Sequence, residues 1–453
     1  MKSKLTICLL LLLLIVSGLA ACSPGHVGGN EIAFVRDGHI WTIDPDGANA
    51  YEIVSQSTPV VGYSWSPNHQ LLAFRTLDES FAKTAAARHL ASNPMTQLPG
   101  DAPSTLNTVG IDGGFPISII SSDASVAYSN AWWDADGSRL LYREESVSPP
   151  PDPDTVLWWV SQSDQPNGIA RKLLPGSFSI PSLSSANQMA TGNSRSGLFT
   201  TTLTGTGLRY LIRGPLPGHP LPATLERVLW QPAQQNPAIL YAIVPTGQAF
   251  NAPPDTVQLV LRTPDGHITT LTTCTCTQFA WSPDGQHILY STGSTYSILN
   301  LDGSLLYRFT AETGSVPYWS PDGQFLLLDG LHSLLLVRPA AQQLRLLLSD
   351  GSQPEPATGT GNTTSAGAST AGSVDALLQP ASNSPWAADS RHVLFLTRGR
   401  LLWQGKPLSA GKGLYTVAID DRGQAQGAPT LVDSGNDIQA GWTYENPNTS
   451  FLF

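Results

Sequence analysis

The chain has 453 residues, 41% of them hydrophobic and 13% charged, so it is long enough to bury a large core. A formal net charge of -10 and the lack of any basic stripe disfavour nucleic acid as a partner. Length alone allows two or three domains. A repeat that runs from end to end, in a chain rich in Gly and Pro, favours a single all-β domain instead.

The first residues have the pattern of an export signal. Lys2 and Lys4 precede a Leu-rich segment, and small residues then lead up to Cys22. This order of positive, apolar and small-residue regions is that of a secretory signal peptide. We predict a signal peptide over residues 1–21 and a tether over residues 22–30. The alternative is an uncleaved membrane helix, for which the apolar segment is at the short end.

The sequence Leu-Ala-Ala-Cys at residues 19–22 resembles the lipobox of bacterial lipoproteins. The resemblance implies that Cys22 becomes the new N-terminus and carries a diacylglyceryl group on its sulfur. Each buried acyl CH2 contributes about 0.8 kcal/mol, so several acyl chains anchor a domain durably. We therefore predict an extracytoplasmic domain that is lipid-anchored at Cys22 to a bacterial membrane.

A short phrase, Trp-Ser-Pro-Asp-Gly, recurs along the chain and is followed each time by a strand-like apolar run. It is intact at residues 281–285 and 319–323, and worn copies begin at Trp65, Trp133, Trp230 and Trp386. Pro suits the second position of a type I turn, Asp or Asn bonds its local backbone, and Gly takes the positive-φ position. The recurring strand, turn and strand predict a β-propeller, in which Trp covers the neighbouring blade. Because the aspartates recur at one turn position, we interpret them as structural rather than catalytic or metal-binding.

We expect four antiparallel strands in each blade, named a to d from the axis outward. Eight innermost strands are predicted over residues 62–65, 130–133, 179–183, 227–230, 278–281, 316–319, 384–386 and 439–443. Eight blades of roughly fifty residues are therefore preferred, in one domain over residues 31–453. The blade over residues 178–213 lacks both the Trp and the Asp-Gly turn, and without it the number of blades falls to seven.

The two ends of the predicted domain fit together. The domain begins at what reads as a second strand, residues 31–36, with no first strand before it. Residues 439–443 read as a first strand with no complete blade after it. We predict that this C-terminal strand completes the N-terminal blade, which closes the ring and removes open sheet edges. Residues 450–453 have no place in this scheme.

The a–b and c–d turns are short and are predicted on one face, whereas the other face carries long loops. These include an inserted b–c loop over residues 77–104, with a helix predicted across residues 81–91, and a flexible Gly/Ser/Thr linker over residues 351–373. Elaborated loops on a rigid scaffold are typical of a binding surface. The candidate binding residues on this face are Phe81, Arg88, His89, Phe250, Asn251 and Trp403.

Cys274 and Cys276 are the cysteines of the predicted folded domain. A Cys-x-Cys pair in an exported protein forms a small-loop disulfide or remains as two packed free thiols, and both alternatives stay open. Two thiolates without a close third and fourth ligand make a metal site unexpected here.

The phrase Trp-Ser-Pro-Asp-Gly, followed by Gln and an apolar run, resembles the repeat of TolB-like, WD-repeat-like bacterial propellers. The same repeat occurs in the propellers of prolyl oligopeptidase-like enzymes. The resemblance implies the fold and an extracytoplasmic setting, and it carries no catalytic residues. In addition, residues 192–197 have the wrong spacing for a Gly-x-Ser-x-Gly nucleophile elbow.

These observations predict a non-catalytic, monomeric scaffold that binds an envelope protein or glycan through its loop face. We expect no metal and no cofactor, and we expect the membrane to be contacted through the lipid anchor. Two alternatives are a propeller enzyme, either a hydrolase or a glycan lyase, and a receptor for a glycan or solute.

Overall fold

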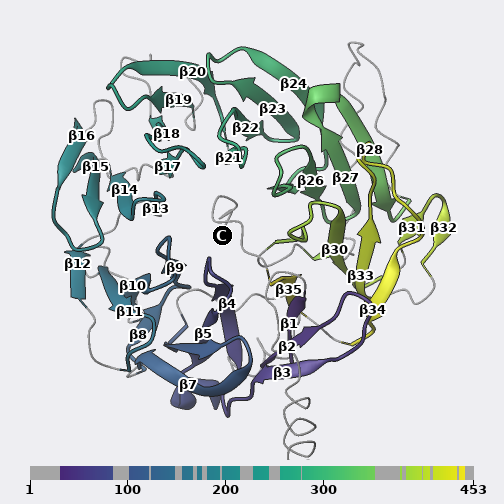
Figure 1. Ribbon diagram of the computed structural model, residues 1–453, viewed down its shortest axis with the longest axis horizontal. Helices are drawn as coiled ribbons and strands as arrows, with labels where there is room; N and C mark the ends of the chain where they lie inside the picture. Colours follow the sequence, from purple (N-terminus) through teal and green to yellow (C-terminus); the bar gives the residue numbers. More distant parts are fainter. Residues whose placement is uncertain are drawn as a thin grey trace, which may run out of the picture.

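The fold is that of a computed structural model, and Figure 1 shows it down the ring axis. The structure describes residues 31–84, 102–121, 124–147, 156–166, 171–175, 181–193, 196–214, 228–243, 256–276, 278–351, 378–379, 384–399, 401–408, 412–435 and 438–443. The predicted signal peptide, the tether with Cys22, residues 450–453, and most of the inserted loop and linker lie outside the described residues.

Eight antiparallel sheets surround a common axis (Figure 1). The prediction of eight four-stranded blades is therefore confirmed, including the blade that lacks a Trp. The regular blades in chain order are β4 (Val60–Trp65), β5 (Leu71–Leu77), β6 (Ser104–Gly110), β7 (Gly113–Ile120); β13 (Ser182–Leu183), β14 (Gln188–Asn193), β15 (Gly197–Thr202), β16 (Arg209–Arg213); β17 (Val228–Trp230), β18 (Ile239–Ile243), β19 (Val257–Arg262), β20 (Ile268–Cys274); and β21 (Gln278–Trp281), β22 (His287–Thr292), β23 (Thr295–Asn300), β24 (Leu305–Thr310). We number these blades 2, 4, 5 and 6.

The closing blade, blade 1, is built from both ends of the domain, as predicted. It contains β35 (Ile438–Trp442), β1 (Ile32–Arg36), β2 (His39–Ile43) and β3 (Tyr51–Val54). β35 pairs with β1 with Ile32 opposite Trp442, and Thr443 N donates to Glu31 O at 2.9 Å. The inner strand of this blade is thus supplied by the last described segment of the chain.

Blade 3 has an interrupted inner strand. It contains β8 (Val126–Tyr128), β9 (Trp132–Trp133), β10 (Arg139–Ser146), β11 (Leu157–Gln162) and β12 (Arg171–Pro175), and β8 and β9 both pair with β10. The predicted continuous strand over 130–133 is therefore wrong at Asn130 and Ala131, which lie in the break. At the break, the Ser129 hydroxyl replaces a backbone acceptor of the ladder: it accepts a hydrogen bond from Arg143 N at 2.9 Å and donates one to Asn130 O at 2.9 Å.

The sheet of blade 7 is extended by a hairpin from blade 8. Blade 7 contains β25 (Val316–Trp319), β26 (Leu326–Asp329), β27 (Ser333–Arg338), the 3-10 helix η2 (Pro339–Ala341) and β28 (Gln343–Ser349). Blade 8 contains β29 (Leu378–Gln379), β30 (His392–Thr397), β33 (Gly413–Ala418) and β34 (Thr430–Asp433). Its b–c segment forms a hairpin, β31 (Leu402–Trp403) and β32 (Lys406–Pro407), which adds to β28 of blade 7.

The inner strand of blade 8 also differs from the prediction. Residues 384–386 do not form a continuous strand, because Ser384 bridges to Trp442 of blade 1 while Trp386 bridges to Val393 of its own blade. β29 supplies the remaining inner-strand pairing. The departure therefore strengthens the contact between blades 8 and 1, where the ring closes.

The core lies between neighbouring blades rather than within each one. One cluster joins Val35 and Ile40 of blade 1 to Trp65 and Phe74 of blade 2, and similar clusters occupy the other interfaces. A single blade exposes both faces of its sheet, so this arrangement is what makes the ring the unit of stability. Every outer c–d pair also carries a β-bulge, which increases the twist of the outer strand.

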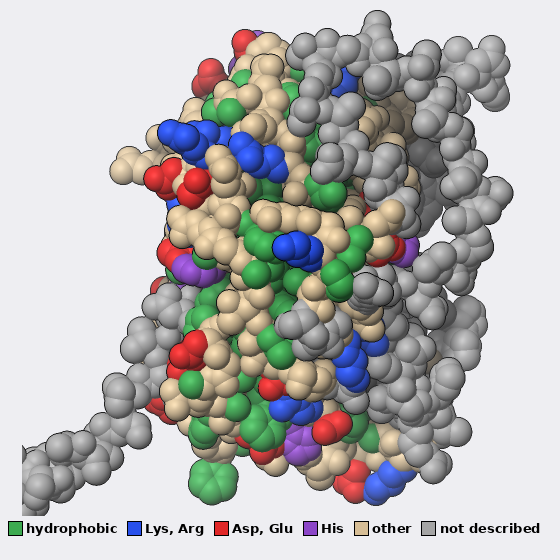
Figure 2. Space-filling model, turned by 90° about the vertical axis from the view of Figure 1, so that its right-hand side faces the viewer, with side chains coloured by type: hydrophobic (Ala, Val, Ile, Leu, Met, Phe, Trp, Pro, Cys, Tyr) green, Lys and Arg blue, Asp and Glu red, His purple; other side chains and the backbone are tan. Residues whose placement is uncertain are grey.

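The outer edge of the disc mixes charges of both signs. In the edge-on view of Figure 2, Lys and Arg side chains lie among Asp and Glu side chains over the described part of this side. No helix in the described ranges is both long enough and apolar enough for a membrane span.

Candidate functional site

One face of the ring, the tight-turn face, carries the a–b and c–d turns, and its aspartates are used in the turns. In the turn after Trp281, the Ser282 hydroxyl donates to Asp284 Oδ1 at 2.5 Å, and Gln286 N donates to the same oxygen at 3.0 Å. Gly285 has φ +68° and donates its N–H to Ser282 O at 2.9 Å. The turn after Trp319 repeats these bonds. Asp284 and Asp322 therefore hold their turns in the way that the structural interpretation expects.

The turns on this face are also linked from blade to blade. Asn68 Nδ2 donates to Asp136 O at 3.0 Å, and Asn187 Oδ1 accepts from Ala135 N at 2.8 Å. Arg391 of blade 8 donates to Asp322 of blade 7 at 2.8 Å. The polar groups of the tight-turn face therefore stabilise the ring.

The tryptophans cover neighbouring blades as the repeat predicted. Trp386 Nε1 donates to Tyr318 O of the preceding blade at 2.9 Å, and Trp133 Nε1 donates to Ser64 Oγ at 3.1 Å. Both side chains are buried. These rings therefore bridge blades.

The opposite face, the loop face, carries the b–c segments and the connections between blades. The long b–c segment of blade 2 begins with helix α2 (Glu79–Ala82). The Asp78 carboxylate caps this helix by accepting a hydrogen bond from Ser80 N at 2.9 Å. The helix predicted across residues 81–91 is therefore corrected: it begins at Glu79 and its described part ends at Ala82. Phe81 is half-buried against Val61, Leu77 and Ala102, so it anchors the segment on blade 2.

Trp403 lies at another part of the loop face, on β31. It is half-buried against the cluster shared by blades 6, 7 and 8. The structure therefore places Phe81 and Trp403 on separate clusters and does not bring them into one site. Arg88, His89, Phe250 and Asn251 lie outside the described residues.

A polar cluster at the loop face surrounds His332, which follows β26. His332 Nδ1 lies 2.9 Å from Asp350 Oδ2, and Glu312 Oε2 accepts from His332 N at 3.0 Å. Ser333 donates its hydroxyl to the same Glu312 oxygen at 3.4 Å. Within the described ranges no group of three or more His, Cys, Asp or Glu side chains is arranged to hold a metal ion.

A buried cation near the loop-face end of blade 2 was missed by the sequence interpretation. Arg75 in β5 is 4% exposed, and it donates from Nε to Asn130 Oδ1 at 2.7 Å and from Nη1 to Tyr128 O at 2.6 Å. Burial lowers the pKa of Arg75 to about 10. No carboxylate of the described residues forms an ion pair with it. The available signal was a single Arg inside the otherwise apolar and small run of strand b.

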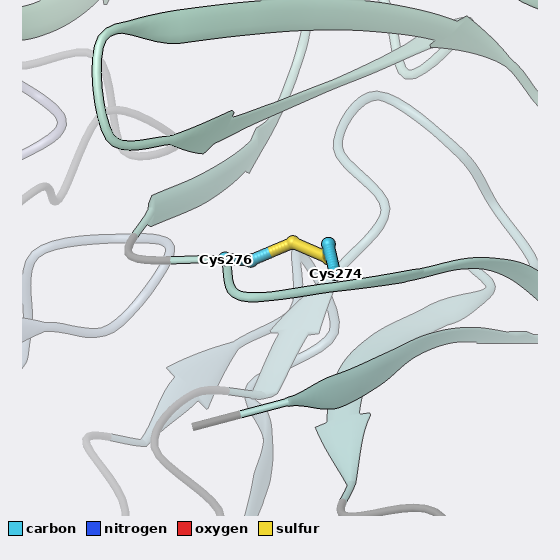
Figure 3. Close-up of a disulfide and its surroundings, with 2 residues drawn as sticks. All are labelled: Cys274 and Cys276. Atoms are coloured by element: carbon cyan, nitrogen blue, oxygen red, sulfur yellow. A yellow bond between two sulfur atoms is a disulfide. The ribbon is translucent and has the colours of Figure 1, made fainter. Parts of the chain in front are cut away.

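Cys274 and Cys276 form a disulfide at the end of β20, where the connection to blade 6 begins (Figure 3). Their Cα atoms are 5.2 Å apart, and both residues pack against the cluster between blades 5 and 6. Of the two alternatives left open by the sequence, the structure therefore has the disulfide.

The geometry defines the chain as an eight-bladed β-propeller closed by its C-terminal strand. No protein-family model matches the sequence, and no curated protein matches it either. Solved structures of similar shape include an oligogalacturonate lyase in complex with manganese (11% identity, 64% of this chain and 79% of that chain, TM-score 0.44). A second is a eukaryotic initiation factor (10% identity, 92% of this chain and 99% of that chain, TM-score 0.48). A third is TolB from Acinetobacter baumannii (14% identity, 63% of this chain and 64% of that chain, TM-score 0.36). These similarities concern shape and assign no activity to this chain.

Proposed function

We propose that this protein is a lipid-anchored, extracytoplasmic scaffold that binds an envelope protein or glycan through its loop face, without catalysis. The observation that carries the proposal is the difference between the two faces. On the tight-turn face the turns are short and their side chains bond the turns and the neighbouring blades. On the loop face, blades 2 and 8 add a helix and a hairpin that the ring itself does not need.

The place where the chain enters the ring supports an orientation for this scaffold. Glu31 O accepts from Thr443 N beside the a–b turns, so the chain enters β1 at the tight-turn face. Residues 22–30, if extended, span about 30 Å. An anchor at Cys22 therefore holds the tight-turn face toward the membrane and leaves the loop face directed away from it.

The anchor is tested by changing Cys22→Ser in the full chain. We expect the lipidated protein to fractionate with membranes and to incorporate an alkyne-tagged fatty acid, whereas C22S incorporates none. Equal labelling of both proteins would refute lipid attachment at this residue. This experiment does not depend on which ligand is bound.

The binding face is tested by shortening the long b–c segment of blade 2. Asp78 N donates to Pro103 O at 2.8 Å, so an Asn-Gly turn in place of residues 79–102 closes the hairpin between β5 and β6. The matched control is Asp46→Ser in a c–d turn of the tight-turn face. After crosslinking in membranes, we expect the partner to be lost from the shortened variant and retained by D46S. Loss from D46S with full recovery from the shortened variant would place binding on the other face.

A further inference from the structure

Arg75 fixes the orientation of the Asn130 amide. A guanidinium carries only donors, so the oxygen that lies 2.7 Å from Arg75 Nε has to be the amide oxygen of Asn130. The amide nitrogen Nδ2 is consequently turned away from the arginine. It has no hydrogen-bond partner among the described residues, and Asn130 is only half-buried. Asn130 therefore presents a donor that the fold does not use.

Two local departures from the repeat make room for this arrangement. The inner strand of blade 3 is broken at Asn130, between β8 and β9, which frees the side chain from the strand. On the facing inner strand of blade 2 stands Gly62, where a Cβ would lie 2.3 Å from Asn130 Oδ1. A side chain at position 62 would therefore displace the amide from Arg75.

The arginine retains unused binding capacity. Its two described hydrogen bonds are donated by Nε and Nη1. Nη2 forms no hydrogen bond with a described residue, and it is not fully buried. Neutral oxygen acceptors offset the charge of a buried guanidinium only in part, and an uncompensated buried charge is unfavourable. A ligand anion would supply the missing counter-charge, and guanidinium groups bind carboxylates and phosphates with paired hydrogen bonds.

We propose that Arg75 and Asn130 form a subsite, between blades 2 and 3, for an anionic oxygen group of the ligand, either a carboxylate or a phosphate. The subsite rests on the proposed binding function and gives its ligand a chemical class. Arg75 Nη2 provides a charged donor and Asn130 Nδ2 a neutral one. The b–c segment between β5 and β6 starts three residues after Arg75, so the subsite adjoins the loop face.

The test is the Asn130→Asp variant of the full chain in detergent. Its carboxylate pairs with Arg75 and removes the Nδ2 donor, so the fold is kept while the place of the ligand anion is taken. Sodium acetate and inorganic phosphate are titrated at constant ionic strength, and affinity is measured by calorimetry and by the rise in Tm. We expect saturable binding of at least one anion to the unchanged protein and at least about tenfold weaker binding to N130D, from the loss of a charged contact. The matched control, Arg391→Gln on the tight-turn face, should bind as the unchanged protein does.

The anion that binds tells the two ligand classes apart: saturation by acetate indicates a carboxylate, and saturation by phosphate indicates a phosphoryl group. Equal binding by N130D, or no saturable binding of either anion, would overturn the subsite. If N130D loses its cooperative unfolding, Asn130→Ser takes its place, because it also lacks the amide donor. A failed partner capture with intact anion binding would count against the proposed function and leave the subsite standing.

Discussion

The closure of the ring at blade 1 predicts a large and localised effect of changing Trp442→Ala. The Trp442 side chain is 2% exposed and packs in the cluster shared by blades 8 and 1. Burying a Trp removes about 200 Å² from water, which at about 25 cal/mol per Å² corresponds to 5 kcal/mol. Truncation of a core Trp costs about 3–5 kcal/mol. We expect W442A to lower the free energy of unfolding by about 4 kcal/mol, a large part of the stability of a typical domain.

The assay combines urea unfolding with hydrogen exchange. Trp319→Ala is the matched control, because Trp319 is equally buried but lies in blade 7, away from the closure. Both variants should lose similar free energy of unfolding. Only W442A should speed amide exchange in β1, whose partner strand is β35. A loss below about 1 kcal/mol for W442A, or the same exchange pattern in both variants, would refute the reasoning.

Three further predictions concern turns and the disulfide. Measured by urea unfolding, Gly285→Ala should lower the free energy of unfolding by about 2–3 kcal/mol and Gly314→Ala by about 1 kcal/mol. Both glycines have positive φ, but of the two only Gly285 has a backbone oxygen 2.7 Å from the position of an added Cβ. Hydrogen bonds from the hydroxyl and the N–H of Ser304 lower the pKa of Asp302. The Asp302 carboxylate therefore stabilises the fold above its unfolded-state pKa, and this contribution is lost as pH falls through its folded-state pKa. The stability difference from Asp302→Asn should therefore shrink between about pH 5 and pH 2 in acid titrations of Tm. Replacing Cys274 and Cys276 together by Ser should cost only about 1.6 kcal/mol, because the closed loop has three residues.

Each of these has an outcome that contradicts it. Equal costs for the two glycine variants would show that the close oxygen moves away without penalty. A difference that persists unchanged at low pH would mean that Asp302 keeps its ordinary titration. A loss above about 4 kcal/mol on removing the disulfide would mean that the bond holds more than its own short loop.

The ring could be predicted from the sequence because its signals are local and repeated. The Pro-Asp-Gly turn sets its own backbone conformation, and the Trp before it marks the end of an inner strand, so the eight-bladed ring was predicted from a few residues in each repeat. Blade 4 lacks both the Trp and the Asp-Gly turn, which is why seven blades stood as the alternative. The closure by β35 followed from counting strands at the two ends of the domain.

Other features depend on contacts between distant residues. The break in the inner strand of blade 3 arises where the Ser129 hydroxyl replaces a ladder bond to Arg143, which no periodicity reveals. Ser384 does not form the predicted strand, because it forms an antiparallel bridge with Trp442 of blade 1. The bulges of the outer hairpins and the pairing of β31 with blade 7 are of the same kind.

The candidate site was the least predictable part. Phe81 and Trp403 were chosen because they are aromatic and lie in long loops, yet both pack onto the ring, since an aromatic ring gains more from burial than from exposure. Arg75 was not among the predicted site residues, because a position inside strand b does not reveal partners on the next blade. Only the juxtaposition of Gly62, Arg75 and Asn130 across two blades gives that arginine its meaning.

The composite first blade has a consequence for how the protein is made. β1 leaves the ribosome early, and its inner neighbour, β35, is synthesised after all the other described strands. Until then β1 exposes an unpaired edge that can add strands from other chains. A nonsense mutation anywhere before β35 should therefore yield a product that aggregates or is degraded, even when seven complete blades have already been translated.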